Sequence, residues 1–171
     1  MTIVETERLT LREFTADDAA FILELLNEPA FIQNIADRGV RTLDDARDYI
    51  ENGPRASYAR NGFGLWRVGL KESDEPVGMC GLIRRDVLED VDIGYAILER
   101  HWGRGYAYEA AAAVLNYGHN VLNIKRIIAI TAPDNIASSR LLEKLGLRFD
   151  KIINLPTMGG ESKLYVPPDT V

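Results

Sequence analysis

Two closely spaced glycines at the start of an alanine-rich segment are the first feature of this sequence that indicates chemistry. Gly103 and Gly105 stand in the stretch HWGRGYA (101–107), which leads into a helix-like run. A helix N-terminus presents unpaired N–H groups and the positive end of the helix dipole, and glycines let the backbone come close to an anion. The stretch therefore predicts a phosphate-binding turn. A tight strand-to-helix connection that needs glycines for their φ angles is the alternative interpretation.

Two common nucleotide-binding motifs do not fit this turn. A Walker loop requires Gly-Lys followed by Ser or Thr before its helix, and the turn lacks that combination. A dinucleotide-binding fingerprint requires a third glycine, and Tyr108 stands at that position. The strand-like runs before the turn are joined by short connections, which indicates an antiparallel meander rather than the opening strand of a parallel sheet.

A second segment, further along the chain, indicates which phosphate carrier is bound. Asn135 is a suitable N-cap for the helical stretch that follows it. The stretches DIGYAILERHWGRGYAYEAAAAVL (92–115) and RIIAITAPDNIASSRLLEKLGLRF (126–149) together closely resemble the GNAT superfamily of acyl-CoA-dependent N-acyltransferases. The opening TERLTLREFTADDA (6–19) resembles the RimJ/RimL-like branch, which contains the ribosomal-protein N-terminal acetyltransferases.

The resemblance implies both a fold and an activity. The implied fold is α+β, with three layers and a central mixed, mostly antiparallel, splayed sheet flanked by helices, over a single acyl-CoA N-acyltransferase domain (1–171). The implied activity is transfer of an acetyl group from acetyl-CoA to a primary amine, either a protein N-terminus or a small molecule, by direct attack in a ternary complex. A non-catalytic acyl-CoA-binding module is the alternative, because Leu142 replaces the tyrosine that protonates the leaving thiolate in many members.

The resemblance also implies which residues bind coenzyme A. The pyrophosphate would lie on the backbone of the turn, with a tryptophan where the superfamily has Gln or Arg; the turn residues are Trp102, Gly103, Arg104, Gly105, Tyr106 and Ala107. The backbone of Ala96, Ile97 and Leu98 would pair with the pantetheine arm, and Asn135 and Ser138 would face it. Arg100 either adds positive charge near the phosphates or is a surface charge.

Two proton transfers require side chains of their own. Ser138 is the candidate that protonates the leaving thiolate or donates a hydrogen bond to it. The alternative is an ordinary serine of a first helical turn, where serine is common. A carboxylate is expected to take the proton of the attacking amine. Asp92 and Glu161 are the candidates for this base, with Asp90 as a further one. The alternative for Asp92 is an exposed charge at the start of a strand, and the alternative for Glu161 is a position in a hairpin turn. Cys80 is expected to be a small core residue.

The composition limits which binding partners and which cellular compartment are expected. The 171 residues carry a formal net charge of −6, which argues against broad binding of nucleic acid. No apolar run approaches the roughly 20 residues of a membrane span, and the N-terminus lacks the apolar stretch of a signal peptide. The single cysteine and the two histidines indicate a reducing compartment and no structural zinc. We expect a cytoplasmic monomer or homodimer that needs no metal.

The elements that must position these residues follow from hydrophobic periodicity. The pattern predicts helices that begin at capping-box sequences and end near Pro29 and Asn52, with a break at 52–54 and a short further helix. These helices are expected to shape the acceptor pocket. Strands are predicted at 8–14, 63–70, 76–85, 90–98, 126–132, 147–153 and 162–166, and later helices at 106–121 and 136–145. The apolar run 126–132 is expected to be a central strand parallel to its neighbour.

Overall fold

The computed structural model describes residues 2–155 and 160–168, and it shows a mixed sheet with strand order β1-β2-β3-β4-β5-β6-β8-β7. The strands are β1 (Thr2–Glu5), β2 (Leu9–Arg12), β3 (Leu65–Leu70), β4 (Pro76–Ile83), β5 (Val91–Ile97), β6 (Ile127–Thr131), β7 (Arg148–Leu155) and β8 (Gly160–Val166). The α-helices are α1 (Ala19–Leu26), α2 (Pro29–Asn34), α3 (Leu43–Ile50), α4 (Ala56–Asn61), α5 (Tyr106–Asn120) and α6 (Ile136–Lys144).

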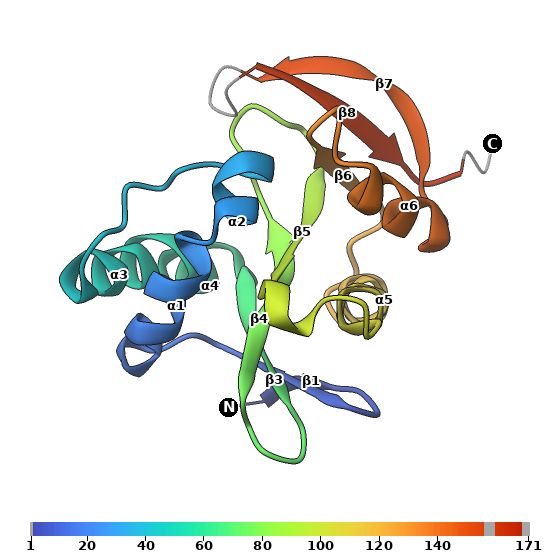
Figure 1. Cartoon of the computed structure of the whole chain (residues 1–171). Helices are drawn as coiled ribbons and strands as arrows, with labels where there is room; N and C mark the ends of the chain where they lie inside the picture. Colours follow the sequence, from blue (N-terminus) through green and yellow to red (C-terminus); the bar gives the residue numbers. More distant parts are fainter. Residues whose placement is uncertain (1, 156–159, 169–171) are drawn as a thin grey trace.

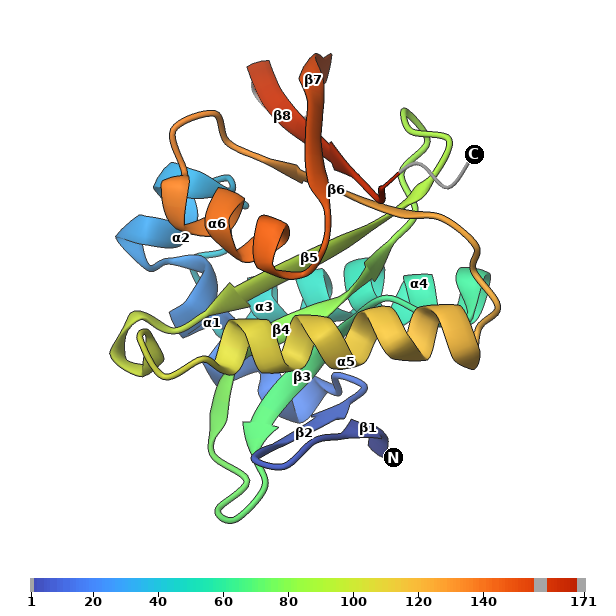
Figure 2. The same ribbon diagram turned by 90° about the vertical axis from the view of Figure 1, so that its right-hand side faces the viewer.

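Helices cover both faces of the sheet. α1, α3 and α4 lie on one face, and α5 and α6 lie on the other (Figure 1, Figure 2). Each face has its own cluster of buried side chains: one includes Trp66, Leu82 and Val114 of α5, and the other includes Phe14, Ile22 and Ile50. This arrangement confirms the predicted α+β class and its three layers.

The pairing of the strands also confirms the predicted meander. β2 through β5 pair with one another in antiparallel fashion, whereas β5 and β6 are parallel. A parallel pair needs a crossover, and α5 supplies it. α5 packs closely on the sheet through small residues, Ala110, Ala111 and Gly118; a Cβ added to Gly118 would lie 2.8 Å from the Ile127 side chain.

Three local features differ from the sequence-based expectation. β1 was not predicted, because its four residues are half-exposed and lack a clear pattern. Pro29 does more than end α1: it also starts α2, where a proline at the first turn loses no hydrogen bond. The predicted break at 52–54 is wrong. A π-helical turn (Glu51–Arg55) leads from α3 into α4, and the Ala56 N–H donates to the Glu51 carbonyl.

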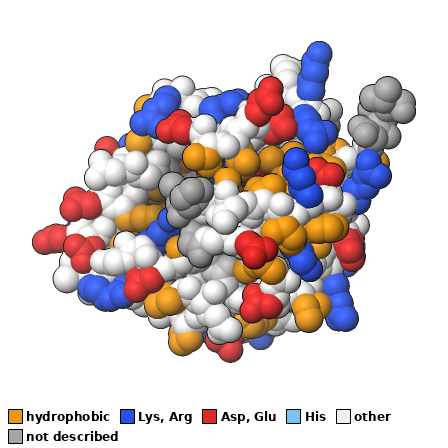
Figure 3. Space-filling view, turned by 90° about the horizontal axis from the view of Figure 1, so that it is seen from above, with side chains coloured by type: hydrophobic (Ala, Val, Ile, Leu, Met, Phe, Trp, Pro, Cys, Tyr) orange, Lys and Arg blue, Asp and Glu red, His pale blue; other side chains and the backbone are white. Residues whose placement is uncertain are grey.

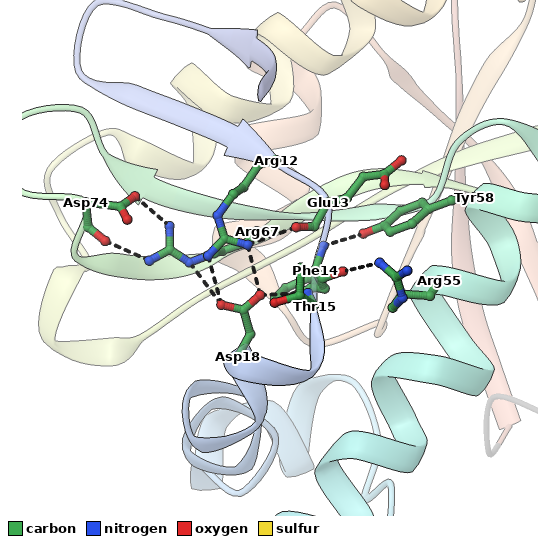
Figure 4. Close-up of polar contacts among 9 residues, drawn as sticks. All are labelled: Arg12, Glu13, Phe14, Thr15, Asp18, Arg55, Tyr58, Arg67 and Asp74. Atoms are coloured by element: carbon green, nitrogen blue, oxygen red, sulfur yellow. Dashed lines mark hydrogen bonds and ion pairs between the residues drawn. The ribbon is translucent and has the colours of Figure 1, made fainter. Parts of the chain in front are cut away.

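A buried cluster of charges joins β2, β3 and the turn before α1 (Figure 4). Arg12 donates two hydrogen bonds of 2.9 Å to Asp18, and the Thr15 N–H donates a third. Arg67 Nε lies 3.6 Å from the same carboxylate, and the Arg67 guanidinium also binds Asp74. Burial by itself would raise the pKa of Asp18, but the hydrogen bonds from Arg12 and Thr15 outweigh it and hold that pKa below its usual value.

Asp18→Ala is expected to lower the free energy of unfolding by about 3 kcal/mol, because it removes the hydrogen bonds from Arg12 and Thr15 and one of the two carboxylates beside the buried Arg67. Urea denaturation measures the change. Asp17→Ala, at the exposed neighbouring position, is the matched control and should change stability by less than about 0.5 kcal/mol. Equal losses in the two variants would contradict a stabilising role of the cluster.

Candidate active site

A cavity of about 780 Å³ lies where β5 and β6 separate. Its walls come from β5, the turn before α5, the start of α6, and α2 with the loop that follows it. The lining combines apolar side chains such as Phe31 and Leu65 with charged ones such as Arg38 and Asp92. The upper surface of the molecule likewise intersperses hydrophobic side chains with acidic and basic ones (Figure 3). The size and the mixed lining are typical of a site for a small molecule.

The separation of the two strands opens the backbone edge of β5. β5 pairs with β4 from Asp92 to Ile97, but it pairs with β6 only at Val91 and Asp92. Of the three residues predicted to pair with pantetheine, Ala96 and Ile97 line the cavity. Leu98 instead is fully buried, and its N–H donates to the Val77 carbonyl.

The glycine turn brings the first turn of α5 to the cavity wall. Gly103 and Gly105 have φ angles of +77° and +81°, in the left-handed region that favours glycine. Gly105 is the N-cap of α5 and provides no side-chain cap. The N–H groups at this helix end are therefore not occupied by a capping side chain.

Five of the six predicted turn residues line the cavity, namely Trp102, Gly103, Gly105, Tyr106 and Ala107. Trp102 also bonds the strand end, because its Nε1 donates to the Ile97 carbonyl at 2.8 Å. Arg104 is exposed and is not part of the lining. Arg100 forms an ion pair with Glu24, which matches a surface charge rather than a group at the turn.

Asn135 and Ser138 lie together on the opposite wall. The Asn135 side chain caps α6, as predicted, by accepting the Ser138 N–H at 3.2 Å. The Ser138 Oγ lies 2.7 Å from the Tyr95 Oη. Tyr95 is both packed against the core and part of the cavity wall. The alternating pattern of the strand does not indicate that Tyr95 meets Ser138, which lies 43 residues further along the chain.

The two carboxylates proposed as bases occupy different environments. Asp92 lines the cavity with a side chain only 1% exposed, and its Oδ1 accepts from Arg85 Nε at 3.0 Å. The alternative of an exposed strand-start charge is therefore wrong. Burial raises the pKa of Asp92 to about 6, although Arg85 acts in the opposite direction. Glu161 also lines the cavity and is exposed on β8, whereas Asp90 pairs with Arg126 at 3.1 Å.

The remaining candidates are engaged in packing. Cys80 is fully buried in the core, as predicted, and burial raises the pKa of its thiol. Leu142 is buried too, and as a leucine it offers no hydroxyl at this position of α6. Within residues 2–155 and 160–168, no three His, Cys, Asp or Glu side chains are grouped as metal ligands, and no helix there is long and apolar enough to span a membrane.

Comparisons with known proteins agree with this geometry. Residues 8–148 match the family model described as an acetyltransferase (GNAT) domain. The chain is 31% identical over 156 residues to the uncharacterized N-acetyltransferase p20 of Bacillus licheniformis, which covers 90% of this chain and 86% of that protein. The solved acetyltransferase of Agrobacterium tumefaciens strain C58 has a TM-score of 0.82 at 25% identity, over 97% of this chain and 94% of that one.

A more distant solved structure shares the fold alone. The ribosomal L7/L12 alpha-N-protein acetyltransferase RimL, solved in complex with coenzyme A, has a TM-score of 0.80 at 16% identity over 97% of each chain. The p20 relative has no assigned acceptor, so the RimJ/RimL-like branch stays a prediction.

The raised pKa of Asp92 makes stability depend on pH. The folded state holds this proton to about pH 6, whereas an unfolded aspartate loses it near pH 4, so the group destabilises the fold as pH rises between these values. Asp92→Asn removes this effect. Between pH 4.5 and 6.5, the stability of the variant should rise by about 2 kcal/mol relative to that of the wild type. Urea denaturation at both pH values measures the difference, and an identical pH dependence in the two proteins would argue against a raised pKa.

Proposed function

The chain belongs to the GNAT family of acetyltransferases and is an acyl-CoA-dependent N-acetyltransferase, and on this premise we propose that it transfers an acetyl group from acetyl-CoA to a primary amine. The transfer takes place by direct attack while both substrates are bound. One observation carries the proposal: a glycine turn at a helix N-terminus and an open strand edge border the same cavity.

The turn before α5 is proposed to bind the pyrophosphate of coenzyme A. The two left-handed glycines shape the turn, and the uncapped helix end supplies backbone N–H donors and positive dipole. Nothing lies within 4 Å of the position that a Cβ on Gly103 would take, so the outer side of the turn is open to a ligand. Arg8 supports the turn from the far side, where it stacks on Tyr106 and pairs with Glu109.

The pantetheine arm is proposed to extend along β5. Its two amides resemble a short peptide, and an open strand edge binds such groups by main-chain hydrogen bonds. Ile97 and Ala96 lie on this edge. Asn135 uses its side-chain oxygen to cap α6, which leaves its NH₂ group to donate to the arm.

In the reaction, the lone pair of a neutral amine attacks the thioester carbonyl. The C–N bond forms, the C–S bond breaks, and the electron pair of that bond goes to sulfur. A backbone N–H of β5 is proposed to stabilise the negative charge on the carbonyl oxygen. Ser138 is proposed to donate a hydrogen bond to the leaving sulfur. The serine keeps its own proton, because the pKa of a thiol, about 8.5, is far below that of an aliphatic alcohol.

Asp92 is proposed to accept the proton of the amine. A pKa of about 6 leaves the carboxylate ionised at neutral pH and still basic enough for general base catalysis. Arg85 holds the carboxylate in a fixed orientation at the cavity wall. Glu161 is the second candidate, because it lines the same cavity.

The acceptor is proposed to enter beside α2. Phe31 and Leu65 give this part of the cavity apolar surface, and Asn34 and Arg38 add polar groups. The opening motif resembles the RimJ/RimL-like branch, which supports a protein N-terminus or a small-molecule amine as the acceptor. We propose that residues 1–171 act as one catalytic domain in the cytoplasm.

Release of the coenzyme A thiol tests the proposal. Acetyl-CoA is incubated with peptides bearing free N-termini, free amino acids and polyamines, and the N-acetylated product is identified by mass spectrometry. Thiol release that requires an amine is expected. Tight binding of acetyl-CoA without turnover of any amine would instead indicate a non-catalytic acyl-CoA-binding module.

A substitution at a glycine of the turn before α5 tests whether this turn binds coenzyme A. Gly105→Ala is expected to raise the Kd for coenzyme A about tenfold, because a side chain disfavours the left-handed N-cap of α5 by about 1–2 kcal/mol and so shifts the free turn away from the proposed binding conformation. Gly62→Ala is the matched control, since Gly62 has a similar φ of +82° at the end of α4 and is not part of the cavity lining. Calorimetry should show unchanged affinity for this control.

Measurement of kcat distinguishes the two candidate bases, Asp92 and Glu161. Asp92→Asn is expected to lower kcat at least about 100-fold, as loss of a general base does, and Glu161→Gln less than about tenfold. Both substitutions replace a carboxylate with an amide of the same shape. The reverse order of effects would assign the base to Glu161.

A further inference from the structure

Tyr95 links the strand edge to the helix on the opposite wall of the cavity. Its side chain projects from β5, and its Oη meets the Ser138 Oγ at 2.7 Å, in the first turn of α6. Both residues line the cavity. This is a direct side-chain contact across the site, between residues 43 positions apart in the chain.

The chemistry of the two hydroxyls decides the direction of this hydrogen bond. A phenol, with a pKa of about 10, is the more acidic hydroxyl and hence the better donor, so Tyr95 donates and the Ser138 oxygen accepts. Burial raises the pKa of Tyr95 further, so the phenol keeps its proton at all pH values at which such an enzyme works. The proton of Ser138 must then point away from Tyr95.

We propose that Tyr95 is a positioning residue, which fixes the Ser138 hydroxyl so that its own proton is directed toward the leaving sulfur of acetyl-CoA. This inference rests on the proposed function, in which Ser138 donates to that sulfur. No bond to hydrogen is broken in the Tyr95–Ser138 pair. A hydroxyl that accepts one hydrogen bond also becomes a stronger donor of another, so Tyr95 orients and polarises the serine together.

The arrangement explains why a lone serine at a helix start suffices here. In an ordinary first turn, a serine hydroxyl rotates freely or bonds the nearby backbone. Ser138 already has its backbone N–H held by Asn135 and its Oγ held by Tyr95. The first bond fixes the backbone of Ser138, and the second restricts rotation of its hydroxyl before any substrate binds.

A double-mutant cycle tests the inference. Ser138→Ala is expected to lower kcat about tenfold and Tyr95→Phe about fivefold, the latter matching the loss of one hydrogen bond between neutral groups. The KM for acetyl-CoA should change less than about twofold in both. The double variant should be no slower than Ser138→Ala alone, because Tyr95 acts only through the serine.

The controls separate this role from a structural one. Tyr95→Phe keeps the ring, and thermal melting confirms that each variant is folded. Tyr117→Phe, on α5 against Trp66 and outside the cavity lining, should leave kcat unchanged. An unchanged kcat in Tyr95→Phe, or an effect of Tyr95→Phe that persists in the Ser138→Ala background, would overturn the inference and leave the proposed function intact. Full turnover by Ser138→Ala would remove the serine from the proposed mechanism and overturn the inference, whereas only the absence of amine-dependent thiol release in the wild type would overturn the proposed function.

Discussion

The hydrogen-bonding requirement of the backbone, at the point where β5 and β6 diverge, is the constraint on which the rest of this molecule depends. Backbone groups inside a protein need partners, and two parallel strands that separate after two paired residues leave such groups facing a cavity. Each strand then takes a different partner on its far side, β4 for β5 and β8 for β6. The opening is stable because the two sheet segments are each paired, and it is available to a ligand that brings amides of its own.

The surrounding elements hold this opening in a fixed shape. The contact between β4 and the open end of β5 has no room for a side chain at Gly78, where a Cβ would come within 2.3 Å of the Ala96 carbonyl oxygen. α5 lies close to the sheet because its inner face is built from alanine and glycine. Its N-terminus, and with it the glycine turn, is thereby fixed at the open edge of β5. The proposed sites for an anion and for an extended amide chain are thus consequences of one packing arrangement.

The two ends of the opening differ in environment, and this difference separates the two proton-handling groups. Asp92 lies at the last position where β5 and β6 still pair, so it is buried and its pKa is raised. Tyr95 and Ser138 face each other further along, where the strands have parted. The proposed base and the proposed hydrogen-bond donor to the leaving sulfur are therefore placed by the same divergence of strands.

The sequence by itself determined the local features. The glycine turn, the Asn135 cap, the antiparallel meander and the parallel strand after α5 all follow from capping, periodicity and turn chemistry, which act over a few residues. The sequence correctly placed the end of α1 near Pro29 but missed α2, which begins at that proline. It was wrong about the 52–54 stretch, where a π-helical turn accommodates Pro54. Only the tertiary structure decided that Asp92 is buried against Arg85 and that Tyr95 meets Ser138. Both contacts join side chains from different elements, and burial and pairing of that kind depend on packing that no local pattern encodes.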